Sequence, residues 1–218
     1  MIRITLITIL LGLSPILSAC DRAYMATMEQ LGYPKRDLLS SRVKSARDAQ
    51  EEAKQDIQSA LQAFGKVVSY QGGDLEATYE KLSGELHASE ASAETVRKRI
   101  KEVESVAKAL FSEWNTELDQ YSSKDLRRKS EARLNQTKAR YNDMHAAMKR
   151  AEQRIDPVLK PLQDQVLYLK HNLNARAVAA IKGELVKVDA QVDQLVKDMN
   201  RSIVEADKFI QSIDKEDA

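Results

Sequence analysis

Apolar residues recur at alternating spacings of four and three over most of the chain, from residue 37 to residue 213. On an α-helix this spacing gathers them into one narrow stripe, which a helix can bury only against the stripe of a neighbour. No run of alternating apolar and polar residues, the pattern typical of a half-buried strand, interrupts it. The sequence therefore predicts an all-α protein built from long helices.

Three breaks divide this pattern into four helical segments. Gly72 and Gly73 supply the backbone freedom of a turn at the first break, Ser122 and Ser123 end the second segment, and residues 171–174 form the third break. Because short turns make sequential helices antiparallel neighbours, we expect an elongated antiparallel bundle or coiled coil of about four helices. The middle pair either packs within this bundle or projects as a bare arm. The segments are expected at residues 37–70, 75–121, 124–170 and 175–213.

Polar residues at the breaks are candidate helix caps, because their side chains can bond to the unpaired backbone N–H groups of a first turn. Asp74 is expected to cap the second segment. Ser122 and Asp125 form a candidate capping box for the third, with aspartate in place of the usual glutamate. Either Asn172 or Asn174 can cap the fourth segment.

Three features within the segments depart from a simple stripe. Gln50 is the single polar member of the first stripe. Pro157 and Pro161 are expected to kink or interrupt the third segment, because proline lacks an N–H donor and clashes with the preceding turn. The fourth segment carries a second apolar row, which indicates contact with more than one helix or, alternatively, an oligomer seam. This row consists of Val196, Ile203 and Ile210.

The first nineteen residues have the layout of a secretory signal peptide. Arg3 is their only charge, an apolar run follows it, and the run is too short for a membrane-spanning helix. The next residues resemble the bacterial lipobox, in which the cysteine thiol receives diacylglycerol and the signal is cut just before it. The lipobox residues are Leu17, Ser18 and Ala19, and the lipid attachment site is Cys20.

These features predict a lipoprotein signal peptide (1–19), a lipidated cysteine with a tether (20–36), a helical bundle (37–214) and a short polar tail (215–218). Acyl chains on the cysteine are expected to hold the body on a membrane, facing the periplasm. By resemblance to enterobacterial sorting rules, Asp21 favours the inner over the outer membrane.

The charge balance and the motifs exclude several classes of function. The 34 basic residues nearly equal the 33 acidic ones, so a bulk nucleic-acid surface is not expected. His87, His145 and His171 lie in separate segments without the spacing of a metal site. Neither a phosphate-binding glycine loop nor a nucleophile elbow occurs. We therefore predict no catalytic residue, metal, cofactor or small-molecule substrate.

One basic cluster offers two interpretations. It follows the second break, which returns toward the lipid if the first segment leads away from the membrane, and three aromatic residues precede it. It can contact anionic lipid headgroups, or it can be an ordinary solvated helix end. The cluster comprises Lys124, Arg127, Arg128, Lys129 and Arg133, and the aromatic residues are Phe111, Trp114 and Tyr121.

Several stretches carry a family resemblance. They are KRDLL at residues 35–39, Arg42-Val43, ARDAQEEAK at 46–54, LKHNLNA at 169–175 and the helical ending at 202–210. In these stretches the chain resembles an uncharacterised family of proteobacterial lipoproteins, domain-of-unknown-function family 2959. The resemblance implies a mostly helical periplasmic lipoprotein and brings no catalytic residues.

Two functional hypotheses follow from the sequence. The first is a non-catalytic structural or protein-interaction module of the cell envelope, fixed by its lipid and binding an envelope protein or a second copy of itself. The alternative is a lipid-surface module that uses the basic turn near residues 121–133. High salt should weaken the second kind of contact but not an apolar helix seam.

Overall fold

The structure is a computed structural model that describes residues 34–215, and all regular elements in this range are helices. This confirms the all-α prediction. The predicted signal peptide, the lipobox with Cys20 and nearly all of the predicted tether lie outside the described residues. The elements are α2 (Lys35–Val68), α3 (Leu75–Glu117), the short 3₁₀ helix η1 (Leu118–Gln120), α4 (Lys124–Gln153), α5 (Ile155–His171) and α6 (Ala175–Asp214).

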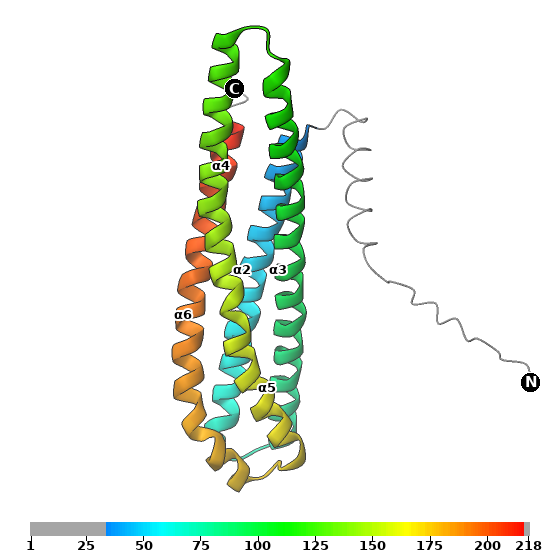
Figure 1. Ribbon diagram of the computed structural model, residues 1–218. Helices are drawn as coiled ribbons and strands as arrows, with labels where there is room; N and C mark the ends of the chain where they lie inside the picture. The colour runs from blue at the N-terminus through cyan, green and yellow to red at the C-terminus, as the bar shows by residue number, and fades with distance from the viewer. Residues whose placement is uncertain (1–33, 216–218) are drawn as a thin grey trace, which may run out of the picture.

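The helices form one long antiparallel four-helix bundle (Figure 1). Helix α2 packs against α3 and α6, and the consecutive helices α4 and α5 pack against the same two helices from the other side. The chain therefore passes along the bundle four times in alternating directions, and the first and last helices are neighbours. With 43 residues, α3 is about 65 Å long, so the bundle is a rod.

The predicted stripes form the core of the rod. Phe64, Phe209, Leu39, Ile57 and Ile100 are among its largest fully buried side chains. The interface of α2 with α3 is the most extensive in the bundle. Small side chains buried on both helices let their backbones approach closely. They are Ala46, Ala49, Ala53, Ala60 and Ala63 on α2, and Ser89, Ser92, Ala93 and Ala107 on α3.

Gln50 is completely buried, as its place in the stripe predicted. The hydroxyl of Ser202 on α6, also completely buried, donates a 2.6 Å hydrogen bond to Oε1 of Gln50. The amide nitrogen Nε2 of Gln50 is buried and has no hydrogen-bond partner among the described residues. The core thus contains one polar link between α2 and α6, and this link is only half satisfied.

Ion pairs connect neighbouring helices along the rod and agree with its antiparallel register. Each joins side chains that are far apart in sequence, so a shift of one helix along another would separate them. The interhelical pairs include Arg42 with Glu102 (3.0 Å), Arg47 with Asp207 (2.6 Å), Arg97 with Asp156 (2.5 Å) and Arg154 with Asp198.

Two of the three predicted caps are confirmed, and one is corrected. Oδ1 of Asp74 accepts from the backbone N–H of Ala77 at 3.0 Å, and the Asn174 side chain caps α6. The Ser122 capping box is wrong by one residue. Because α4 begins at Lys124, Ser123 is its N-cap, and Ser123 Oγ accepts from the N–H of Leu126 at 3.4 Å.

The prolines act differently from one another. The break in the third predicted segment falls at Arg154, where α4 ends and α5 starts one residue later. The ring of Pro157 would clash with the carbonyl four residues earlier, at Gln153, which is the last residue of α4. Pro161 lies inside α5 without ending it. At the other end, α2 begins at Lys35, directly after Pro34 and two residues before the predicted start.

The hairpin of α3 and α4 projects beyond the ends of α2 and α6 (Figure 1). The pair between Lys35 Nζ and Glu113 Oε2 (2.9 Å) shows that α2 starts beside Glu113, before α3 reaches its end. Both arrangements considered for the middle pair are therefore present: it packs within the bundle over most of its length and projects at one end.

Candidate functional site

The projecting end of the hairpin, residues 118–133, is called the tip here. Its two arms, η1 and the start of α4, are in contact, and Leu118 on η1 and Leu134 just beyond the tip on α4 are buried. Nε1 of Trp114 donates a 2.8 Å hydrogen bond to Oγ of Ser130 across the hairpin. The tip is thus a packed two-helix structure.

The structure brings the five predicted basic residues together on the first three turns of α4. Three of them form ion pairs within the tip. Arg127 reaches Asp119 at 3.1 Å, while Arg128 and Lys129 both contact the carboxylate of Asp125, at 3.1 and 3.0 Å. Asp125 therefore neutralises part of the basic cluster instead of completing a capping box.

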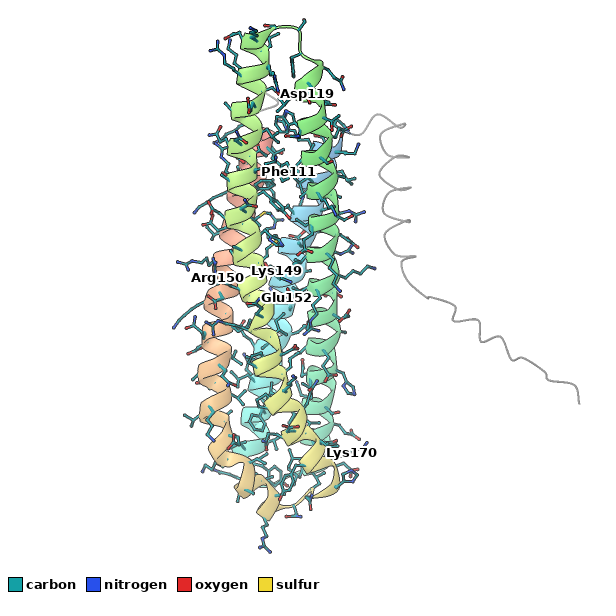
Figure 2. All side chains as sticks on the ribbon, in the orientation of Figure 1. Phe111, Asp119, Lys149, Arg150, Glu152 and Lys170 are labelled. Atoms are coloured by element: carbon teal, nitrogen blue, oxygen red, sulfur yellow. The ribbon has the colours of Figure 1, made fainter. Side chains whose placement is uncertain are left out.

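The basic residues do not form one continuous face. Side chains four residues apart share a face of a helix, which places Lys124 with Arg128 on one flank of α4 and Lys129 with Arg133 on the other. Arg127 lies between them and is turned toward η1 by Asp119. Figure 2 shows Asp119 near the projecting end and Phe111 further inside the bundle.

Two large apolar side chains of the tip are exposed to solvent. Tyr121, in the turn, is 43% exposed, and Leu126, in the first turn of α4, is 53% exposed. The sequence analysis did not select Leu126. In the sequence, Leu126 is a leucine outside the apolar stripe and close to a helix start. That position alone does not show whether its side chain is exposed or buried. Exposed apolar groups among cations are typical of surfaces that meet a membrane interface.

The tip lies at the end of the bundle where α2 begins and α6 ends. Besides the pair of Lys35 with Glu113, Nη2 of Arg36 donates a 2.9 Å hydrogen bond to the backbone carbonyl of Ile213. The first and last turns of the bundle are therefore side by side, close to the base of the tip (Figure 1). The lipid itself is predicted at Cys20, outside the described residues.

An open hollow of about 350 Å³ lies between α4 and the end of α6. Two features reduce the positive potential of its cationic lining. Lys208 is paired with Glu205 at 2.8 Å, and the carbonyl end of α6 adds negative potential. The hollow is therefore a weak candidate for an anion site. It is lined by Arg140, Lys208, Gln211, Ser212 and Lys215.

A small aromatic cluster joins α3, α4 and α6 below the tip. The ring of Tyr141 stacks on His145 and meets Phe111 edge-on, with centroids 5.5 and 5.4 Å apart. Burial raises the pKa of the Tyr141 hydroxyl to about 12, and the nearby Glu104 carboxylate adds to the increase. Oε1 of Glu104 is 2.7 Å from Nε2 of His145, so the Glu104 carboxylate and the His145 ring bond to each other across α3 and α4.

The other two histidines lie elsewhere. His87 contacts Glu90 on the same helix at 3.2 Å, and His171 ends α5. Within residues 34–215, no group of three or more His, Cys, Asp or Glu side chains is arranged to hold a metal ion. Over the same range, no helix has a stretch long and apolar enough to cross a membrane.

Comparison with known proteins identifies the family of the chain. A search of curated proteins finds no match. The family model described as a protein of unknown function (DUF2959) matches residues 24–213, which include every helix of the bundle except the last residue of α6. The resemblance noted in the sequence is thus confirmed, and the chain belongs to this family of unknown function.

Proposed function

We propose that the protein is a lipid-anchored, non-catalytic rod of the cell envelope that presents its helical surfaces to a partner protein. One observation carries the proposal: α2, the first described helix after the predicted lipid site, starts at one end of a long bundle whose helices are joined by ion pairs. A rod held at one end keeps its sides and its far end at fixed distances from the membrane. This geometry suits spacing or partner recognition.

The proposed anchor is Cys20, with Leu17, Ser18 and Ala19 as the recognition residues of the lipobox. Acyl chains add about 0.8 kcal/mol of membrane affinity for each buried CH₂ group, so several chains retain a protein without a spanning helix. We place the body in the periplasm, with the inner membrane favoured by Asp21.

The anchor is tested by replacing Cys20 with serine in native cells and following acylation and fractionation. The expected result is that the original chain incorporates a labelled fatty acid and sediments with membranes, while the Cys20→Ser variant carries no label and is released. Equal labelling, or equal sedimentation, of both chains would contradict the proposal.

The partner is tested with photo-reactive residues at exposed apolar positions, since such positions are enriched at protein interfaces. Val186 on α6 is 74% exposed, Leu167 on α5 is 59% exposed, and Val204 on α6 is 50% exposed. Lys197, an exposed polar position on α6, is the matched control. Discrete crosslinks to one envelope protein or to a second copy, absent at Lys197, are expected. Crosslinks no different from those at Lys197 would count against an interaction module.

A second candidate function, binding of a lipid surface, is favoured by the position of the tip. A basic hairpin that projects at the anchored end faces the membrane, whereas the same residues at the far end would not.

A further inference from the structure

We propose that the tip is a second, peripheral membrane contact that binds the surface of an anionic phospholipid bilayer. In this contact Tyr121 and Leu126 enter the interface, and Lys124 and Arg128 lie against headgroup phosphates. The inference rests on the proposed function only in taking the anchored end as the end nearest the membrane. It adds the residues of contact and the chemistry of the lipid.

The apolar part of the argument rests on exposure. Half of the Leu126 side chain and nearly half of the Tyr121 side chain are in water, although Leu118 and Leu134 close by are buried. The tip thus buries some apolar side chains and leaves Tyr121 and Leu126 on its surface. Tyrosine suits a membrane interface because its ring enters the apolar layer while its hydroxyl stays hydrated.

The charge of the tip selects an anionic surface. Residues 118–133 contain five basic and three acidic side chains. Asp119 and Asp125 pair with Arg127, Arg128 and Lys129, but all these side chains are more than half exposed, so the pairs are weak and Arg128 can exchange its contact with Asp125 for a headgroup phosphate. Lys124 and Arg128 share one exposed flank of the first turns of α4, and Leu126 lies on the opposite flank of the same turns. A bilayer that meets the end of the hairpin therefore contacts cations on one side of the helix and Leu126 on the other. Cations around an apolar contact are the arrangement by which peripheral proteins recognise acidic lipids.

The length of the tether allows the contact. Fourteen residues separate Cys20 from Lys35, and a chain of this length spans up to about 45 Å. Lys35 lies beside Glu113, so the α3 arm extends past the start of α2 by about seven residues, or roughly 10 Å. A lipid on Cys20 can therefore reach a bilayer that the tip also touches.

The test is vesicle sedimentation with residues 20–218 carrying Cys20→Ser, which cannot be acylated and retains every described residue. We expect binding to phosphatidylcholine vesicles containing roughly 30% phosphatidylglycerol, little binding to pure phosphatidylcholine, and a loss as salt rises. Lys124→Gln with Arg128→Gln should weaken binding at least about tenfold. Leu126→Ser should weaken it about fivefold without removing the preference for acidic lipid.

The matched control is Arg176→Gln with Lys182→Gln, which removes one arginine and one lysine from exposed positions near the other end of the rod. This control should bind like the parent. Absence of binding at about 50 mM salt would overturn the inference. So would an equal loss in the control, which would indicate attraction by net charge alone. Circular dichroism of each variant verifies folding. Since no chain here is acylated, the outcome is independent of whether Cys20 is the anchor.

Discussion

The buried pair of Gln50 and Ser202 offers a sharp test of how the core is held together. Both side chains have no exposed surface, and Ser202 donates to Oε1 of Gln50 at 2.6 Å. The Nε2 group of Gln50 is left without a partner among the described residues. A buried donor in this condition costs about 1–3 kcal/mol.

Two sets of substitutions should therefore change stability in different directions. Ser202→Ala alone leaves the whole amide of Gln50 unpaired, so the free energy of unfolding should fall by about 2 kcal/mol. Combining Ser202→Ala with Gln50→Leu removes all these polar atoms and fills the space with apolar volume. The double variant should equal the parent or exceed it by up to about 2 kcal/mol.

Urea unfolding followed by helical circular dichroism measures these differences, and thermal unfolding provides a second measure. In a domain of this size, 2 kcal/mol corresponds to roughly 4–8 °C in Tm. Ser92→Ala is the control, because buried Ser92 donates only to the Ser89 carbonyl within its own helix, at 3.2 Å. If Ser202→Ala costs no more than Ser92→Ala, or if the double variant is less stable than Ser202→Ala, the reasoning is refuted.

Three further predictions concern other parts of the bundle. Unfolded tyrosine ionises near pH 10 and folded Tyr141 near pH 12, so its contribution to stability is complete below pH 10 and lost between pH 10 and 12. Tyr141→Phe should remove this loss of stability between pH 10 and 12, which amounts to roughly 1 kcal/mol after solvent screening of the half-buried group. Urea unfolding at pH 9 to 12 measures it, and the same dependence of stability on pH in both chains would contradict the prediction. Asn174→Ala removes the side chain that accepts from two backbone N–H groups at the start of α6 and should cost about 1 kcal/mol, with faster amide exchange in that turn; uniform exchange would argue against the cap. Ala53→Leu should cost about 1–3 kcal/mol, because Ala53 is fully buried in the core face of α2 and leaves no room for a larger side chain. Ala190→Leu, on an exposed position, should change stability little, and equal effects of the two substitutions would contradict the prediction.

The sequence predicted the architecture well because the stripes carry most of the folding information. The burial of Gln50 and the cap at Asp74 followed from spacing and chemistry alone, whereas the sequence left Asn172 and Asn174 as alternatives and the structure selects Asn174. The wider apolar row on the last segment indicated more than one neighbour, and α6 indeed packs against α2, α4 and α5. Local patterns of this kind are set by residues within one or two helical turns.

What the sequence could not provide depends on contacts across the bundle. The partner of Gln50 is 152 positions away, and spacing along one helix does not reveal it. Ser122 and Ser123 are chemically equivalent as caps, and only the position of the first helical residue separates them. The exposure of Leu126 depends on how far α3 and α4 extend beyond the other helices, which the lengths of the segments alone did not determine.

The neighbouring positions of the first and last turns have a consequence for the polarity of the molecule. Because Arg36 contacts Ile213, a short peptide could join the two ends of the bundle, and the chain could be opened instead at Gly72 and Gly73 at the opposite end. Such a circular permutant would keep the same packed helices but begin at the far end. Placed behind the same anchor, it would turn the rod upside down and carry the basic hairpin away from the bilayer. Orientation and fold, which are inseparable in the natural chain, would then become independent variables.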